Sequence, residues 1–226
     1  MQYSDIHKAV FRSRPNRFIA KVELDGAEAT VHVKNTGRCR ELLVPGATVY
    51  LEKSSNPARK TLYDLVAVEK GTRLINMDAQ APNQVFGEWA QAGRFRPCLT
   101  LLRPETTWGR SRFDFYWETE EQKGFVEVKG CTLEEDGACF FPDAPTERGV
   151  KHVEELIAAH AVGFDACLFL VIQMSGVDYW SPNDHTHPEF GGAVRRALAA
   201  GVEVLAYDCA VSPDALALGR PVEVRL

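Results

Sequence analysis

The sequence predicts an α+β protein in which a small β-barrel is followed by a mixed sheet flanked by helices. Three observations predict this fold class. Short strands separated by turn residues occupy residues 17–76, and helices alternating with apolar strands follow from residue 84. The chain has 226 residues, of which 45% are hydrophobic and 25% are charged, enough for two small domains of an ordinary globular protein.

Five short strands form the expected barrel. They span residues 17–24, 28–33, 48–53, 62–69 and 73–76. Asp25-Gly26, between the first two, is a strong signal for a hairpin turn. Val49 and Leu51 alternate with polar neighbours, which indicates a half-buried strand. Five such strands fit the five-stranded OB-fold.

Basic and aromatic side chains are interleaved along the same residues. The basic ones are Arg12, Arg14, Arg17, Arg38, Arg40, Arg59 and Lys60, and the aromatic ones are Phe11, Phe18, Tyr50 and Tyr63. A barrel that binds a nucleic-acid strand needs positive groups for the phosphates and aromatic rings for the bases. We therefore expect residues 1–80 to form an OB-like nucleic-acid-binding domain. The alternative is that Phe18 and Tyr63 fill the barrel interior.

Helices and apolar strands organise the second part, after an expected linker at residues 76–83. The expected helices span residues 84–92, 148–162 and 189–200, and the expected strands span 99–102, 112–117, 124–132, 166–174, 202–207 and 222–226. The continuous apolar run at 166–174 is typical of a strand buried on both faces. We expect residues 81–226 to form a second domain, with a mixed sheet between helices.

Charge is distributed unevenly between these two parts. Residues 1–80 carry 13 Lys and Arg against 9 Asp and Glu, whereas residues 81–226 carry 13 against 22. A basic part attracts phosphates, and clustered carboxylates attract metal ions, although two solvated surfaces explain the charge equally well. The six cysteines include no CxxC pair, so we expect neither a zinc site nor a disulfide framework.

The start of the chain lacks the apolar core that a secretory signal needs. The longest apolar stretch, Ala166 to Ile172, is far shorter than a membrane span. We therefore expect a cytoplasmic protein that does not contact membranes.

Two neighbouring strands hold the residues with the clearest chemistry. In residues 112–117 polar and apolar side chains alternate, so Arg112, Asp114 and Tyr116 should share one face, and Glu127 and Lys129 should share a face of the next strand. A symmetric hairpin places Asp114 opposite Glu127. Magnesium typically takes one or two protein carboxylates, and a nearby lysine can orient the water that attacks a phosphodiester. Arg112 could hold a flanking phosphate. The alternative is a plain ion-pair network, Arg112 with Glu127 and Asp114 with Lys129.

An Asp followed by Glu-x-Lys on the next strand resembles the PD-(D/E)xK nuclease superfamily, although Arg112-Phe113, and no proline, precedes the Asp. Longer strings sharpen the resemblance. They are residues 35–38 (NTGR), 110–115 (RSRFDF), 127–133 (EVKGCTL) and 141–152 (FPDAPTERGVKH). With them the chain resembles the sugar fermentation stimulation protein A family over nearly its whole length. The resemblance implies an N-terminal OB-like domain, a C-terminal restriction-endonuclease-like domain and DNA binding with little sequence preference.

The resemblance also implies a set of site residues. Asp114, Glu127 and Lys129 fall on the nuclease-like catalytic triad, and a helical Asn83…Glu88 pair makes Glu88 a candidate third metal ligand beside Asp114 and Glu127. The expected metal is Mg²⁺ or Mn²⁺. The expected nucleic-acid-binding residues are Arg14, Arg17, Asn35, Thr36, Arg38, Arg112, Arg148 and Lys151. His152 is interpreted as a structural residue, with a hydrogen bond to substrate as the alternative.

Three functional hypotheses follow. The first is a metal-dependent nuclease that hydrolyses DNA or RNA with a metal-activated water. The second is a non-catalytic, sequence-tolerant DNA-binding protein that regulates sugar-metabolism genes and retains a nuclease fold. The third is an enzyme acting on another phosphorylated substrate, with the barrel as a protein-interaction module. DNA is the expected partner, RNA is the alternative, and the oligomeric state, including a homodimer, is open.

Overall fold

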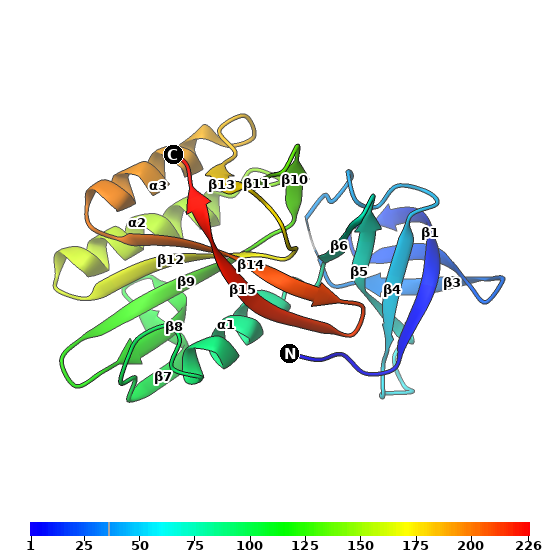
Figure 1. Ribbon diagram of the computed structural model, residues 1–226, viewed down its shortest axis with the longest axis horizontal. Coiled ribbons are helices and arrows are strands. Elements are labelled where there is room, and N and C mark those ends of the chain that lie inside the picture. Colours follow the sequence, from blue (N-terminus) through cyan, green and yellow to red (C-terminus); the bar gives the residue numbers. More distant parts are fainter. Residues whose placement is uncertain (36) are drawn as a thin grey trace.

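The computed structural model describes residues 1–35 and 37–226, and it places a barrel beside a large sheet covered by helices (Figure 1). The barrel strands are β1 (Ile6–Asn16), β2 (Ile19–Leu24), β3 (Ala27–Val33), β4 (Thr48–Lys53) and β5 (Tyr63–Lys70). They pair in the order β3-β2-β1-β4-β5, and a further pairing of β3 with β5 closes the ring. The predicted five-stranded OB-like barrel is therefore confirmed. A sixth strand, β6 (Arg73–Asn76), forms a hairpin with β5.

The sequence did not predict β1: the first expected strand, 17–24, corresponds to β2, and the fifth, 73–76, is β6, which lies outside the closed ring. Only Ala9 and Phe11 of the eleven residues of β1 are buried, and its pairing with β2 shifts register between Phe11 and Asn16. A regular two-residue alternation is lost at such irregularities, so the periodicity is weak. Phe11 is buried in the barrel interior, whereas the ring of Phe18 is 49% exposed on the outside.

The second part contains a nine-stranded mixed sheet in the order β10-β11-β13-β15-β14-β12-β9-β8-β7. Its strands are β7 (Leu101–Trp108), β8 (Ser111–Glu118), β9 (Lys123–Cys131), β10 (Leu133–Glu135), β11 (Ala138–Phe141), β12 (Asp165–Ile172), β13 (Tyr179–Pro182), β14 (Glu203–Ser212) and β15 (Ala215–Val224). β9, β12 and β14 run parallel in the centre, and β7, β8 and β9 form an antiparallel meander. The predicted mixed sheet between helices is confirmed.

Three helices cover this sheet: α1 (Ala81–Gln91), α2 (Glu147–Ala161) and α3 (Pro188–Ala199). Residues 168 and 170 of β12 pack with α2 and α3 on one face, and residues 167 and 169 pack with α1 on the other. This two-sided burial explains the continuous apolar run of β12. The hydroxyl of Thr146 caps α2 by accepting the backbone N–H of Gly149 at 3.1 Å.

Several elements differ from the sequence predictions. β7 runs to Trp108 although it was expected to end at 102, and it carries Pro104 and, at Glu105, a φ of 50° in the left-handed region. β14 and β15 are longer than expected, and the short strands β10, β11 and β13 were not predicted. β7 is an edge strand and β10, β11 and β13 are short, and in such strands irregular and polar sequences weaken the alternation.

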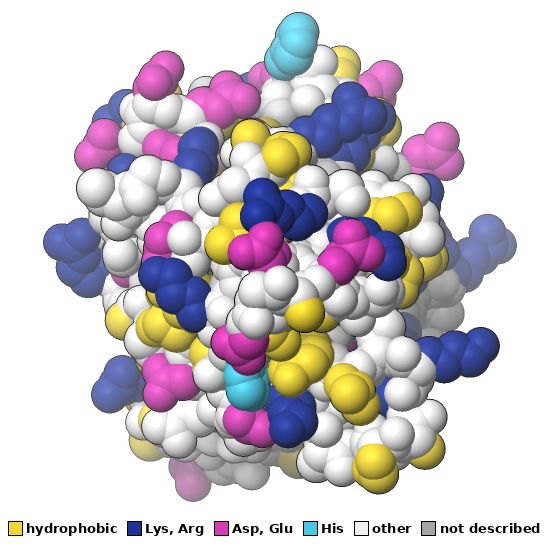
Figure 2. Space-filling view, turned by 90° about the vertical axis from the view of Figure 1, so that its right-hand side faces the viewer, with side chains coloured by type: hydrophobic (Ala, Val, Ile, Leu, Met, Phe, Trp, Pro, Cys, Tyr) yellow, Lys and Arg dark blue, Asp and Glu magenta, His cyan; other side chains and the backbone are white. Residues whose placement is uncertain are grey.

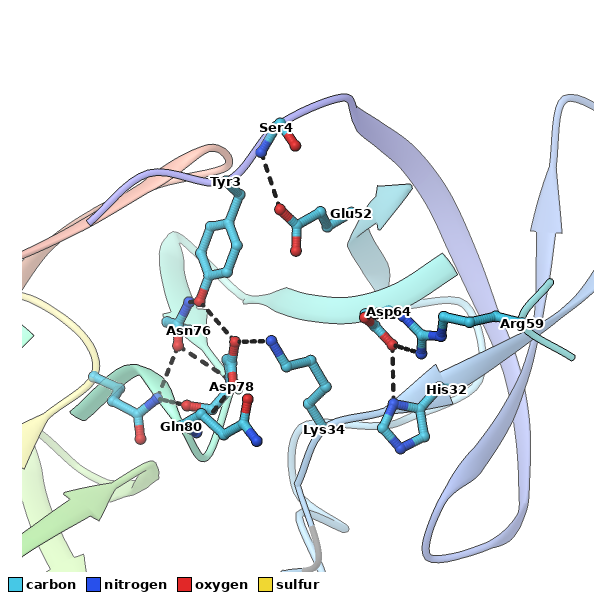
Figure 3. Close-up of polar contacts among 11 residues, drawn as sticks. Tyr3, Ser4, His32, Lys34, Glu52, Arg59, Asp64, Asn76, Asp78 and Gln80 are labelled. Atoms are coloured by element: carbon cyan, nitrogen blue, oxygen red, sulfur yellow. Dashed lines mark hydrogen bonds and ion pairs between the residues drawn. The ribbon is translucent and has the colours of Figure 1, made fainter. Parts of the chain in front are cut away.

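The predicted linker at 76–83 is instead a buried polar network, and α1 begins within it at Ala81 (Figure 3). Asn76 and Asp78 are each only 1% exposed. The Gln173 amide donates to Asn76 Oδ1 at 2.8 Å, and Asn76 in turn donates to the Tyr3 hydroxyl at 2.8 Å. The Lys34 ammonium lies 2.5 Å from the Asp78 carboxylate. Because these groups come from both parts of the chain, the network fixes the barrel against the sheet.

The first three residues also join the two parts, because their backbone lies against β15 (Figure 1) while the Tyr3 hydroxyl belongs to the polar network at Asn76. Gln2 forms a bridge with Ala215, and the Tyr3 N–H donates to the Asp214 carbonyl at 2.7 Å. The barrel is therefore connected to the second part at both of its ends. Among the described residues, no helix is both long and apolar enough to cross a membrane.

Candidate active site

Asp114 on β8 lies at the centre of the candidate site. One of its carboxylate oxygens accepts the backbone N–H of Val128 on β9 at 2.8 Å, and the other accepts the side-chain amide of Asn83 on α1 at 2.8 Å. Burial raises the pKa of Asp114, and the negative charge of Glu127 raises it further. The two carboxylates are therefore electrostatically coupled neighbours, as the hairpin register predicted.

The path of β8 differs from the simple alternation that was expected. Phe115 and Trp117 pack on the α1 face, whereas Phe113 packs with Phe125 on the opposite face. Tyr116 also contacts Phe125, so it does not share a polar face with Asp114. The neighbours of Asp114, Phe113 and Phe115, thus pack on opposite sides of the sheet.

Glu127 on β9 is almost completely buried, with a side chain only 1% exposed. Its Oε1 accepts hydrogen bonds from Lys129 and from His152 of α2. Burial would raise the pKa of Glu127, but the hydrogen bond from His152 and the charge of Lys129 outweigh it, so the pKa lies below its ordinary value. Its second oxygen, Oε2, is buried and has no hydrogen-bond partner among the described residues. A buried anionic oxygen without a partner is costly unless a cation approaches it.

His152 connects Glu127 to Arg148. The Arg148 Nε lies 3.3 Å from His152 Nε2, and arginine can only donate, so Nε2 accepts and the ring proton lies on Nδ1. That proton points at Glu127 Oε1. A histidine that donates to a carboxylate in this way fixes the orientation of the carboxylate. The role of His152 as a partner of Glu127 was missed from the sequence.

The donor set fits one divalent cation. Asp114 and Glu127 offer hard oxygen ligands, Glu127 Oε2 lacks a partner, and Mg²⁺ typically binds one or two protein carboxylates together with water and phosphate. In the described part of the chain, no group of three or more His, Cys, Asp and Glu side chains comes together as a metal site. Two carboxylates are therefore what the protein itself provides.

Glu88, the third expected ligand, does not join this pair. Its carboxylate lies 2.7 Å from the N-terminal ammonium of Met1 and also accepts the Gln84 amide at 3.0 Å. Asn83 and Glu88 are five residues apart on α1, so their side chains point about 140° apart around the helix. Because Asn83 faces Asp114, Glu88 points away from it, and the structure does not bring Glu88 together with Asp114 and Glu127.

The expected ion-pair alternative is also not what forms. Lys129 pairs with Glu127, and exposed Arg112 lies 3.4 Å from Glu105 of β7. Lys151 donates to the Arg110 carbonyl at 3.0 Å and lies 3.8 Å from Glu155, one helical turn along α2. Arg112 and Lys151 thus border the site on the exposed side and do not contact either carboxylate.

The expected contacts from the barrel divide into two kinds. The Arg14 guanidinium donates to four backbone carbonyls, those of Arg17, Asn35, Gly37 and Arg38, at 2.7–2.9 Å. Arg14 therefore shapes the loop, and it is not available to a phosphate. The Asn35 side chain accepts the Gly37 N–H at 2.7 Å, which is also a structural contact. Arg17 and Arg38 are exposed, and Thr36 lies outside the described residues.

The outer face of the barrel mixes positive and negative side chains without a basic patch (Figure 2). Barrel cations there form ion pairs: Arg12 with Glu23, Lys21 with Glu28, and Arg59 with Asp64. A cleft of about 540 Å³ lies between Asn35, Gly37 and Arg38 of the barrel and the segment 140–146 of the second part. The sequence did not predict this cleft, because residues far apart in the chain form it.

Comparisons with known proteins agree with this architecture. Residues 13–77 match the family model of an SfsA N-terminal OB domain, and residues 80–215 match that of a sugar fermentation stimulation protein RE domain. A sugar fermentation stimulation protein homologue of Desulfitobacterium hafniense strain Y51 is 54% identical over 226 residues, covering 100% of this chain and 99% of the relative. A homologue from Ruminiclostridium cellulolyticum is 52% identical, with 100% of both chains covered. The solved structure of Pyrococcus furiosus SfsA in complex with Ca²⁺ superimposes with a TM-score of 0.91 at 25% identity, covering 100% of this chain and 98% of that one.

Proposed function

This chain belongs to the sugar fermentation stimulation protein family, and from that premise we propose that it is a metal-dependent nuclease that hydrolyses phosphodiester bonds of DNA. Asp114 and Glu127 hold the cation, Mg²⁺ or Mn²⁺, and Lys129 completes the catalytic group. The observation that carries the proposal is Glu127 Oε2, a buried carboxylate oxygen without a partner among the described residues, beside a second carboxylate and a lysine. The Pyrococcus furiosus relative, solved in complex with Ca²⁺, supports a divalent cation in the family.

When bound, the cation supplies Lewis-acid stabilisation of the negative charge that develops on the phosphate oxygens. The protein's own residues do the rest. Asn83 and the Val128 N–H hold the Asp114 carboxylate in place. His152 holds Glu127 through Oε1 and leaves Oε2 free to bind. Such fixed ligands lower the reorganisation that the reaction requires.

Lys129 contributes a positive charge and spare protons. Its ammonium has three N–H donors, and Glu127 accepts one. The side chain is 19% exposed, so the remaining donors can reach a water or a phosphate oxygen. In this role Lys129 orients the attacking water and offsets negative charge as the proton leaves it.

The test is cleavage of labelled single- and double-stranded DNA and RNA in Mg²⁺, Mn²⁺ or EDTA. Asp114→Asn and Lys129→Met should lower cleavage by about 10²- to 10⁴-fold, the range for groups engaged in proton transfer and charge stabilisation, while nucleic-acid binding persists. Glu88→Gln is the matched control, because Glu88 faces the N-terminus, and it should cleave like the wild type.

Binding without cleavage, equal in the wild type and both site variants, would reject the nuclease. It would leave a DNA-binding protein whose carboxylates and lysine form only a structural ion-pair network. Cleavage of RNA but not DNA would keep the site and change the substrate. Cleavage that Glu88→Gln abolishes and Asp114→Asn does not would reject the residues named here.

A further inference from the structure

The cleft between the two parts has a polar mouth and an aromatic wall. The barrel contributes Arg17, Asn35, Gly37 and Arg38, and the second part contributes β9–β10, β11 and the segment that leads into α2. A smaller hollow of about 330 Å³ shares Arg17, Gly37 and Arg38 with the cleft and continues to Arg40. The two hollows together form one path along the barrel loop.

The arginines that line these hollows differ from the paired barrel cations Arg12, Lys21 and Arg59. Arg17, Arg38 and Arg40 are exposed, and within residues 1–35 and 37–226 none of them lies within ion-pair distance of a carboxylate. Asp143 is the acidic residue of the cleft, and its Oδ2 accepts the backbone N–H of Arg38 at 2.8 Å, which fixes the loop. Exposed, unpaired arginines are suited to bind phosphates.

The aromatic wall offers one ring for stacking. Phe141 is engaged in the core, where its ring centroid lies 5.1 Å from that of Phe190. Phe140 is half-buried, lines the cleft and, among the described residues, has one aromatic contact, an edge contact to Tyr179 with centroids 6.4 Å apart. A base that stacks on such a ring gains affinity whatever its identity, because every base has a π-face.

We propose that this cleft binds a single-stranded stretch of nucleic acid, with a base against Phe140 and phosphates at Arg17 and Arg38. The inference rests on the proposed function and specifies its substrate. The cleft has a volume of about 540 Å³. A base can stack on Phe140 only where it is unstacked from its neighbours, as in a single strand, because both faces of a base in a duplex are covered.

The cleft lies beside the segments that carry the candidate catalytic residues. Gly130 lines it and directly follows Lys129 in β9, and Thr146 lines it two residues before Arg148, the partner of His152. A single strand bound in the cleft would therefore lie next to the segments that hold the proposed site.

The test is fluorescence anisotropy of a labelled 12-nucleotide single strand and of the same sequence as a duplex, with the full chain in EDTA. Phe140→Ala should weaken single-strand binding by roughly 5- to 150-fold, the range for one stacked base. Phe140→Leu keeps an apolar side chain against Tyr179, removes the ring and should weaken binding in the same way. Arg38→Gln should lower the slope of log K against log salt by about 0.7.

Matched controls lie outside the cleft. Phe18→Ala removes an exposed ring on the outer barrel, and Arg12→Gln removes a cation paired with Glu23. Both should bind within twofold of the wild type. Equal affinity for duplex and single strand would overturn the inference. So would a loss of affinity in Phe18→Ala together with unchanged affinity in both Phe140 variants.

The two proposals fail separately. If the wild type cleaves but the Phe140 and Arg38 variants bind and cleave normally, the cleft inference fails and the nuclease stands. If those variants lose single-strand binding and no protein cleaves, the cleft stands as a binding site and the proposed nuclease fails. If the wild type binds neither nucleic-acid form, both are overturned.

Discussion

Asp114→Asn should make the cation-free protein slightly more stable and remove its stabilisation by divalent cations. In the wild type the ionised Asp114 is buried beside the negative charge of Glu127, and both effects raise its pKa. Two unit charges about 5 Å apart interact by roughly 3 kcal/mol at an effective dielectric constant of 20. Lys129 offsets much of this repulsion, so we expect a net gain of about 1 kcal/mol, or about 2–4 °C in Tm for a chain of this size.

The substitution keeps the hydrogen bonds of the site. The new amide oxygen accepts the Val128 N–H, and the new NH₂ group donates to the oxygen of the Asn83 side chain once that amide has rotated by half a turn. Loss of a hydrogen bond therefore does not mask the electrostatic effect.

The cation response gives the second half of the prediction. A ligand at 100 times its Kd stabilises the folded state by about 2.7 kcal/mol, which raises Tm by about 5–11 °C. We expect this shift with Mg²⁺ or Mn²⁺ in the wild type and in Glu88→Gln, and its loss in Asp114→Asn. Differential scanning calorimetry at fixed protein concentration measures both.

The pH dependence has a defined sign. Because the pKa of Asp114 is raised in the folded state, protonation there stabilises folding at low pH, and that contribution is lost as the pH rises through the folded pKa. The Tm advantage of Asp114→Asn should therefore shrink as the pH falls. An equal cation shift in the variant and the wild type, or a variant that is several kcal/mol less stable, would refute the reasoning.

Three further predictions concern other residues. His152→Ala should weaken cation affinity by about 10- to 100-fold, and His152→Asn, which retains an N–H donor to Glu127, should restore most of it in a calorimetric titration. Asp78→Ala should destabilise the protein by about 3–5 kcal/mol in a urea titration, because it leaves the Lys34 charge without its buried partner; a loss below 1 kcal/mol would show that the network is dispensable. A thiol reagent should label exposed Cys98 in the native protein and leave buried Cys39 unmodified, since burial raises the pKa of Cys39 to about 12; fast labelling of two or more thiols would contradict this.

The sequence predicted the elements that obey a clear periodicity. β8, β9 and β12 were found because their apolar residues alternate or run continuously, and the hairpin between β8 and β9 correctly brought Asp114 and Glu127 together. β1 escaped because two register shifts interrupt its alternation. The alternation of polar and apolar residues predicts strands where the structure is regular, and it is lost at bulges and at sheet edges.

Contacts between residues that are distant in the chain could not be predicted from the sequence. The sequence predicted Arg14 to be a free cation that binds phosphate. In the structure its guanidinium instead donates hydrogen bonds to four backbone carbonyls. The cleft depends on Arg38 meeting Asp143, which is 105 residues away. One signal was available for His152, because it lies four residues after Arg148 and beside Val153 on the buried face of α2, where a histidine needs polar partners.

The contact of residues 1–3 with β15 sets the order in which the chain can finish folding during synthesis. The ribosome makes the N-terminal segment first, yet the residues that hold it, Asp214 to Leu216, emerge more than two hundred positions later. Until then the barrel has only one of its two attachments to the second part. A nascent chain arrested before residue 214 should consequently have its first residues accessible to proteases, and they should become protected only after the β14–β15 hairpin has left the exit tunnel.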